Sequence, residues 1–199
     1  MAGMFNDRST PLALLRTRRS GKPRDLAEPG PDLDQLMEMV ALASRTPDHG
    51  KLFPWRFVVI PPEHRQAFAA KLVAILKAEK PDCTPRDIEA AEQFALQAPA
   101  LVVLLSSPHH GHKIPLWEQE LSAGAIGMNL LHAAHAMGFA AGWLTDWPAY
   151  SDAVRDLFGL APQRIAGFFF IGTPLRELQE RPRPLLSDIA KIWRPGVDE

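Results

Sequence analysis

The sequence predicts a single domain in which helices alternate with β-strands. Four short segments rich in β-branched, aromatic and other apolar residues are typical of buried strands, near residues 55–60, 100–107, 139–145 and 166–173. The stretches between them carry apolar residues at helical spacing. At 199 residues, 46% of them hydrophobic, the chain is long enough to form one complete core. We therefore expect one domain over residues 1–199, with residues 1–8 loose.

The composition excludes several classes of partner and location. A formal net charge of -1 provides no field that would attract nucleic acid or an acidic membrane surface. No segment approaches the roughly 18 apolar residues of a membrane-spanning helix, and the N-terminus lacks the apolar core of a signal peptide. The single cysteine, Cys83, excludes an internal disulfide and a cysteine-based metal cage, which fits a reducing compartment. We expect a cytoplasmic protein that binds neither nucleic acid nor membranes and holds no metal.

A short helix is predicted to begin the domain and to end in a basic segment. Thr10 can cap this helix, with Pro11 at its first position. The residues that follow the helix are Arg18, Arg19 and Ser20, where arginines have the alternative role of complementing the helix dipole. Apolar spacing predicts the remaining helices over residues 32–46, 63–79, 85–96, 118–137 and 151–158.

Proline and turn-forming residues predict an irregular loop immediately before the first strand. Pro47 and Pro54 exclude both regular helix and central strand between them. A loop held between a long helix and a core strand is a rigid place for binding groups, and this loop carries Arg45 and His49. His49 has the alternative role of a surface or loop-capping histidine. Trp55, at the start of the strand, is expected to be a core residue.

The second half of the chain is predicted to contain the most buried strand and the longest helix. Residues 100–107 form a continuous apolar run, so we expect both faces of this strand to be buried. The helix over residues 118–137 is small and apolar almost all round and ends at Gly138. Small residues on it indicate close approach of another helix, from a second subunit. These residues are Ala123, Ala125 and Gly127.

A histidine-rich loop follows the buried strand. It contains His109, His110 and His112. Imidazole is a good metal ligand, but these residues lack a helical i, i+4 pair and an adjoining carboxylate. The pattern therefore favours a surface loop over a metal site.

No glycine-rich phosphate loop is present, since neither GxGxxG nor GxxxxGK[ST] follows a predicted strand. Any bound phosphate must therefore be held by arginines. Arg181 and Arg183 lie in backbone that Pro182 and Pro184 force to be extended. The 19 prolines are nearly twice the average share of about 5%, as in a chain that reaches over another protomer. We expect residues 175–199 to form an extended tail that packs on a partner subunit.

Four separated motifs follow one another in a specific order. They are Arg18-Arg19-Ser20; Thr46-Pro47-Asp48-His49 with Pro54-Trp55; Gln119 and Asn129-Leu130-Leu131 leading to Gly138-Phe139 and Trp143; and Gly172-Thr173-Pro174 before an arginine-rich tail. In this order and spacing the motifs resemble the nitroreductase family of FMN-dependent oxidoreductases. The segment HKIPLWEQELSAG, from His112 to Gly124, is most similar to the minimal, YdjA-like bacterial members. The resemblance covers about residues 8–190.

The resemblance implies an α+β fold in which a mixed central β-sheet is flanked by helices. It also implies an obligate homodimer with FMN at the subunit interface. Arg18, Arg19 and Ser20 would hold the phosphate and ribityl end of FMN. Arg181 and Arg183 fall where other members place cations near this phosphate.

The same resemblance assigns contacts to the flavin ring. Arg45 and His49 would reach the flavin from the partner subunit, and either side chain could stabilise the negative charge of the reduced ring. Trp143, Leu144 and Thr145 would lie along the isoalloxazine, although a tryptophan is by composition more often a core residue.

The implied activity is that of an FMN-dependent NAD(P)H oxidoreductase. It would reduce small-molecule acceptors, either nitroaromatic, quinone-like or otherwise conjugated, by ping-pong hydride transfer. No residue is assigned as catalytic, because the flavin carries out the redox chemistry. Two alternatives stay open: specialised flavin chemistry on the same fold, such as reductive dehalogenation or flavin fragmentation, and a non-catalytic flavin-binding protein. The first ranks lower because the sequence lacks a long lid insertion.

Overall fold

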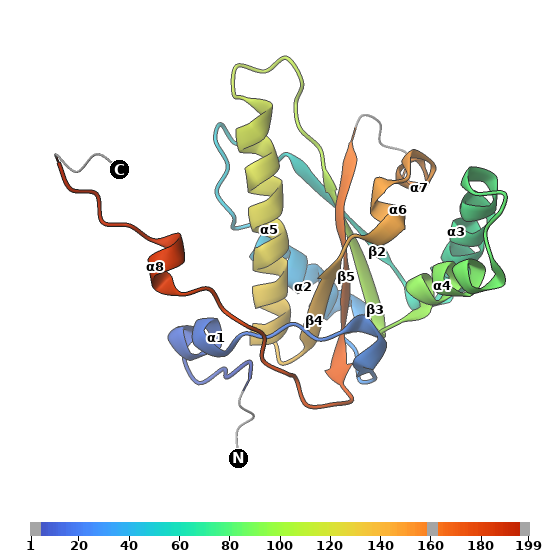
Figure 1. Cartoon of the computed structure of the whole chain (residues 1–199), viewed down its shortest axis with the longest axis horizontal. Coiled ribbons are helices and arrows are strands. Elements are labelled where there is room, and N and C mark those ends of the chain that lie inside the picture. The colour runs from blue at the N-terminus through green and yellow to red at the C-terminus, as the bar shows by residue number, and fades with distance from the viewer. Residues whose placement is uncertain (1–4, 159–162, 196–199) are drawn as a thin grey trace.

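The computed structural model describes residues 5–158 and 163–195 and shows a five-stranded sheet with helices on both faces (Figure 1). The strands are β1 (Leu26–Ala27), β2 (Trp55–Ile60), β3 (Ala100–Ser106), β4 (Ala140–Leu144) and β5 (Arg164–Pro174). The α-helices are α1 (Pro11–Thr17), α2 (Leu33–Ala43), α3 (Arg65–Glu79), α4 (Pro85–Leu96), α5 (Leu116–Ala136), α6 (Asp146–Tyr150), α7 (Asp152–Asp156) and α8 (Leu186–Ile189). Two short 3-10 helices, η1 (Pro23–Asp25) and η2 (Pro62–His64), complete the described elements.

The sheet is built around β5. One edge of β5 pairs with β3, which in turn pairs with β2, and the other edge pairs with β4 and β1. All these pairings are antiparallel, so among the described strands the sheet is antiparallel and not mixed. The reason is visible at β2 and β3: the α3–α4 hairpin returns the chain to the end of the sheet where β2 finished, and Ile60 pairs with Leu101. The α+β class itself is confirmed.

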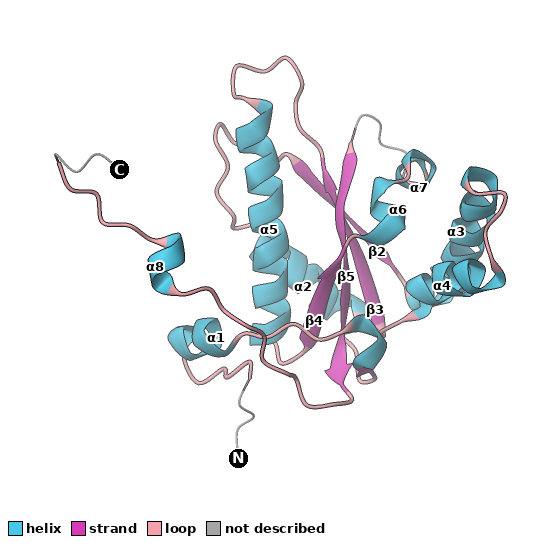
Figure 2. Ribbon diagram, in the orientation of Figure 1, coloured by secondary structure: helices cyan, strands magenta, loops and turns pink. Residues whose placement is uncertain are grey.

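Helices lie on the two faces of the sheet (Figure 2), and an apolar layer of side chains fills the space on each face. On β3, Leu101, Val103 and Leu105 belong to the layer that includes α3 and α4, and Val102 and Leu104 belong to the layer that includes α2 and α5. All five side chains are fully buried. The strand is therefore buried on both faces, as its continuous apolar sequence predicts.

The long helix α5 lies directly on the sheet. Gly127 permits this contact, because a Cβ at this position would come within 2.9 Å of the Trp143 ring and 3.0 Å of Phe169. The close approach expected of this glycine is thus made to the sheet of its own chain, not to another helix. Gly138, with a φ of +97°, ends the helix as predicted.

Helix α2 ends earlier than predicted, at Ala43 rather than next to Pro47. The hydroxyl of Ser44 donates to the carbonyl of Val40, and that of Thr46 to the carbonyl of Ala43, each at 2.8 Å. These side chains compete with the continuing helix for its last carbonyls. The loop that carries His49 therefore begins before the proline.

Two other boundaries differ from the prediction. The single helix expected over residues 151–158 is shorter, because α7 ends at Asp156, and a separate helix, α6, precedes it. Ser151 divides them, and its hydroxyl caps the first turn of α7. Strand β1 was not predicted, because two residues are too few to show a periodicity.

The N-terminal segment is attached to the end of α1. The N–H of Asn6 donates to the carbonyl of Thr17 at 3.0 Å, and its side chain exchanges two hydrogen bonds with the backbone of Arg19. The N–H of Asp7 donates to the Thr17 hydroxyl at 2.9 Å. The expectation of a loose segment is therefore wrong for Asn6 and Asp7, and residues 1–4 lie outside the described part. In that part, no helix has the length and apolar character of a membrane span.

Candidate functional site

Two segments far apart in the sequence bring arginine side chains together. Arg18 and Arg19 follow α1, and Arg181 and Arg183 lie in the chain that leaves β5. Arg19 Nε donates to the backbone carbonyl of Gln179 at 2.5 Å, which holds the second segment against the first. We call these four residues the arginine cluster. The structure thus unites the arginines that the sequence assigned to one phosphate.

Arg18 is the most enclosed member of the arginine cluster. Burial, followed by the positive charges of Arg183, Arg19 and Arg181, lowers the pKa of Arg18 from its ordinary value. Its Nη1 donates to the hydroxyl of Ser20 at 3.0 Å, so both predicted phosphate ligands face the same region. The cations repel one another here, and an anion would relieve that repulsion.

One carboxylate lies within the arginine cluster. Glu180 Oε1 is 3.0 Å from Arg183 Nη2 and 3.9 Å from Arg19 Nε. Within residues 5–158 and 163–195, it is the only acidic residue that forms an ion pair with the cluster. The hydrogen bond from the backbone N–H of Arg181 lowers the pKa of Glu180. The hydrogen bond and charge of Arg183 and the charge of Arg19 lower this pKa further. Two of the four guanidinium groups, those of Arg19 and Arg183, therefore pair with one carboxylate.

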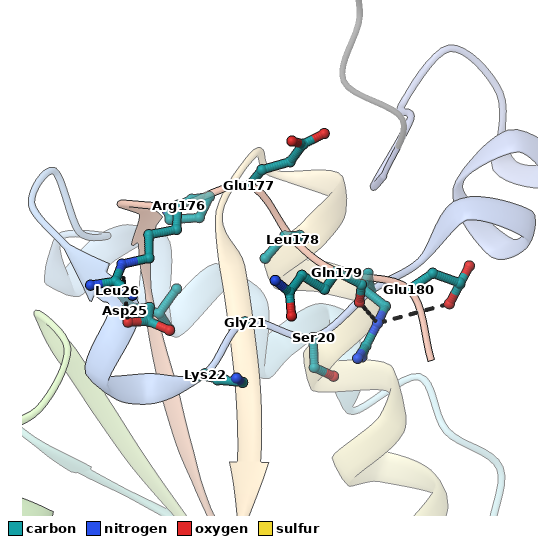
Figure 3. A pocket seen from close by; sticks show the side chains of 12 residues that line it. Ser20, Gly21, Lys22, Asp25, Leu26, Arg176, Glu177, Leu178, Gln179 and Glu180 are labelled. Atoms are coloured by element: carbon teal, nitrogen blue, oxygen red, sulfur yellow. Dashed lines mark hydrogen bonds and ion pairs between the residues drawn. The ribbon is translucent and has the colours of Figure 1, made fainter. Parts of the chain in front are cut away.

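A pocket of about 170 Å³ opens between the two segments. Figure 3 shows Ser20 on one side of it and Gln179 and Glu180 beside it. One wall is fixed to the sheet, because the N–H of Gly21 donates to the carbonyl of Ala141 in β4 at 3.1 Å. The segment after α1 is therefore held by backbone contacts and not only by its charged side chains.

The loop before β2 is ordered by its own polar side chains. Asp48 Oδ2 accepts hydrogen bonds from the backbone N–H groups of Leu52 (2.5 Å) and Phe53 (3.0 Å). Asn129, in the middle of α5, donates to the hydroxyl of Thr46 at 2.6 Å. These bonds fix the loop on α5, which makes it the rigid platform that the sequence predicts.

His49 lies far from the arginine cluster of the same chain. His49 Nδ1 is 2.8 Å from Glu118 Oε2 in the first turn of α5, and its ring is 67% exposed. Arg18 instead lies near the last turn of α5, where it lowers the pKa of His135. At 1.5 Å per residue, the helix between Glu118 and His135 is about 25 Å long. One chain therefore places His49 and Arg18 near opposite ends of α5.

The three predicted ring contacts, at the end of β4 and just after it, face different surroundings. Trp143 packs against Phe169, with ring centroids 4.9 Å apart, and its Nε1 donates to the carbonyl of Ala166 at 3.0 Å. Leu144 packs against the apolar layer on the opposite face of the sheet. Thr145 is the residue before α6 and is partly exposed. The side chains of Trp143 and Leu144 cannot both line one ring, and the contact of each with a flavin stays a prediction.

Sequence reasoning missed a buried histidine next to this site. His135 is fully buried, and its Nε2 accepts a hydrogen bond from the N–H of Ala141 at 3.3 Å. Its Nδ1 has no hydrogen-bond partner among the described residues. Burial, and then the charges of Arg18 and His132, lower the pKa of His135 to about 4. The sequence alone does not show whether a histidine within an apolar helix is buried or exposed.

The histidine-rich loop is exposed, as predicted. His112 Nδ1 accepts a hydrogen bond from the N–H of Ile114 at 3.2 Å and so helps to shape the loop. Within the described part of the chain, no group of three or more potential ligand residues could hold a metal ion. Trp55 is 6% exposed, which confirms it as a core residue.

Comparisons with known proteins agree with this fold. Residues 15–173 match the family model described as "Nitroreductase family". The chain is 38% identical over 164 residues to "Putative NAD(P)H nitroreductase YdjA" of Escherichia coli (strain K12), a match that covers 82% of this chain and 87% of that protein. This chain therefore belongs to the nitroreductase family.

Solved structures show the same fold. The nitroreductase-like family protein from Bacillus cereus superposes with a TM-score of 0.78 at 19% identity and covers 93% of this chain and 96% of that chain. The "FMN and NADPH-dependent nitroreductase NfnB" from sphigopyxis sp. strain HMH has a TM-score of 0.69 at 22% identity, with 90% and 96% covered. At such identities the likeness concerns the fold alone.

Proposed function

We propose that this chain is an FMN-dependent NAD(P)H oxidoreductase that works as a homodimer. The observation that carries the proposal is the arginine cluster, which two distant segments assemble around a single carboxylate. Family membership supports an oxidoreductase. The name of the similar structure NfnB includes both FMN and NADPH, which supports the choice of cofactor and electron donor.

The residues present fit the phosphate end of FMN. A flavin phosphate carries close to two negative charges, and guanidinium groups bind such oxygens through bidentate, charge-assisted hydrogen bonds. Arg18 is already partly desolvated beside three other cations, so a dianion would relieve their repulsion. We assign the phosphate to Arg18, Arg19, Arg181 and Arg183, with the Ser20 hydroxyl as a further ligand.

The rest of the site is proposed to form between two copies of the chain. The span of about 25 Å along α5 between Glu118 and His135 separates His49 from Arg18 within one chain, which supports a site with ligands from two chains. Two α5 helices that run antiparallel about a two-fold axis would put the start of one beside the end of the other. Arg45 and His49 would then complete the site of the partner.

Exposed apolar surfaces support the homodimer. α1, α2 and α5 enclose a hollow of about 390 Å³, and Leu15 and Leu42 on its rim are 61% and 45% exposed. The chain after β5 stands clear of the sheet (Figure 1) and exposes several large apolar side chains to solvent. These are Leu185, Leu186, Ile189, Ile192 and Trp193. A partner subunit that covered both surfaces would remove this area from water.

Bound FMN would supply the hydride-transfer chemistry, and the chain would bind and orient it. The arginine cluster would anchor the phosphate, and the segment after α1, which is hydrogen-bonded to β4, would form one wall of the site. A cation or N–H donor from Arg45 or His49 would stabilise the negative charge of the reduced ring, and no residue need act as a catalytic acid. We propose nitroaromatic, quinone-like or other conjugated small molecules as acceptors, with NADH or NADPH as donor.

Replacing two arginines tests the cofactor assignment. Arg18→Ala with Arg19→Ala should remove charge-assisted bonds worth about 1.5–3 kcal/mol each and weaken FMN binding by at least roughly tenfold. The control, Arg16→Ala with Arg24→Ala, removes the same charge from exposed positions nearby. Flavin content after dialysis and the dissociation constant are measured. An unchanged flavin content in the first double variant would exclude the assignment.

Subunit complementation tests the shared site. One variant carries changes at Arg18 and Arg19, and the other at Arg45 and His49. When the two variants are unfolded together and refolded, one of the two sites in each heterodimer should regain every wild-type side chain. NAD(P)H-dependent activity should then exceed that of either parent. If mass measurement shows that heterodimers form and no such activity appears, both groups of residues act within a single protomer, or their role is structural.

A further inference from the structure

Glu180 occupies the place in the arginine cluster where an anion is expected. Its Oε1 accepts from the backbone N–H of Arg181 at 2.8 Å and from Arg183 Nη2 at 3.0 Å, and it lies 3.9 Å from Arg19 Nε. The same carboxylate oxygen therefore meets cations from both segments of the site.

These donors are the ones assigned to the phosphate of FMN. A carboxylate and a phosphate present similar oxygens to a guanidinium group, but the phosphate carries nearly twice the charge. Glu180 also belongs to the lining of the pocket, and its side chain extends from it toward the guanidinium group to which a dashed line joins it (Figure 3). The two anions would thus compete for the cations of Arg19 and Arg183.

We propose that Glu180 is an internal competitor for the phosphate of FMN. Its carboxylate pairs with Arg19 and Arg183 in the cofactor-free chain and gives up these pairs when the phosphate binds. The proposal rests on the proposed function, because it takes the arginine cluster as the phosphate site.

Two consequences follow for cofactor binding. First, the affinity for FMN is lower than the four arginines alone would give, because each binding event breaks the ion pairs of Glu180. Second, riboflavin lacks the phosphate and has no need to displace Glu180. Glu180 therefore lowers the affinity for FMN but not for riboflavin, and so reduces the difference in affinity between the two flavins.

An ordinary surface ion pair makes a different prediction. Glu180 is 56% exposed, and exposed pairs generally contribute little to stability. If Glu180 only tethers the segment after β5 to Arg19, removing its charge should affect both flavins alike or weaken both. The comparison between FMN and riboflavin therefore separates competition from tethering.

The test measures dissociation constants of FMN and riboflavin by quenching of flavin fluorescence. Glu180→Gln keeps the size of the side chain and removes its charge. Glu177→Gln is the matched control, because Glu177 is exposed on the same segment and forms no ion pair with any residue that the structure describes. Wild type and both variants are compared at low and at high salt.

Glu180→Gln should bind FMN about two- to tenfold more tightly than wild type, with riboflavin unchanged. The gain should shrink at high salt, since exposed charges are screened there. Glu177→Gln should give a smaller change for FMN. Unchanged or weaker FMN binding by Glu180→Gln, or an equal gain for riboflavin, would overturn the proposal. If the wild type binds no flavin, the proposed function itself fails, which is a separate result.

Discussion

The buried His135 makes stability depend on pH in a window that can be calculated. In the unfolded chain a histidine binds a proton below pH 6.5, whereas in the folded chain the pKa of His135 is about 4. Between these values the unfolded state binds more protons, so stability rises with pH. The stabilisation from a neutral His135 is complete above pH 6.5 and is lost as the pH falls toward 4. The contribution of the neutral His135 to the free energy of unfolding is about 3 kcal/mol in total, and roughly 2 kcal/mol of it is lost between pH 7 and pH 5.

Replacing His135 with glutamine should remove this pH dependence. The amide oxygen of His135→Gln can still accept the N–H of Ala141, but the side chain stays neutral at all pH values. Free energies of unfolding are measured in urea at pH 7 and pH 5, at fixed protein and FMN concentrations. Wild type should lose about 2 kcal/mol more than the variant over this range. His110→Gln, at an exposed position, should behave as wild type. Equal losses in wild type and His135→Gln would refute the reasoning.

Three further predictions concern stability and assembly. Arg65 is 5% exposed and donates to carbonyls at the end of α4, so Arg65→Leu should cost about 2–4 kcal/mol in urea unfolding, whereas exposed Arg86→Leu should change little. Gly142→Ala would place a Cβ 2.5 Å from the carbonyl oxygen of Gly21, so it should both destabilise the chain and weaken FMN binding in a flavin titration. The protein should be a dimer even when dilute, with an interface above about 2,000 Å²; light scattering that finds a 22.1 kDa monomer with bound flavin would contradict this.

Most of the sheet could be predicted from sequence because its strands are short, continuous and apolar. β2 matches its predicted range, and β3, β4 and β5 begin or end within about two residues of theirs. The pairing of these strands could not be predicted, because apolar composition carries no information on direction. The register of Ile60 against Leu101 depends instead on the α3–α4 hairpin that brings the chain back.

The residues of the arginine cluster were predicted from sequence, but their arrangement in space was not. Arg18 and Arg181 are distant in the sequence, and only the family resemblance placed them at one phosphate. Their proximity depends on a hydrogen bond from Arg19 to a backbone carbonyl, at Gln179, which any residue could supply. The ion pairs of Glu180 with this cluster were missed for the same reason, since an acidic residue next to Arg181 is typical of any charged surface segment.

For the loop before β2, the local backbone could be predicted from sequence, whereas its contact with α5 could not. Its proline and turn residues predict an irregular backbone, and the structure adds that the Asp48 carboxylate accepts two backbone N–H groups. The sequence could not show that His49 would meet Glu118, because this pairing depends on how the loop lies across the start of α5. The separation of His49 and Arg18 along α5 is the observation behind the proposal that they serve different sites.

The central claim is that this chain holds FMN at the arginine cluster and exchanges hydride between NAD(P)H and a small acceptor. The direct measurement is an anaerobic titration of the FMN-loaded protein with NADH or NADPH while the visible flavin absorption is followed. We predict that the absorption bleaches with at least one of the two donors and returns when a quinone or nitroaromatic compound is added. A protein that takes up no FMN, or whose flavin absorption neither donor changes, would contradict the account.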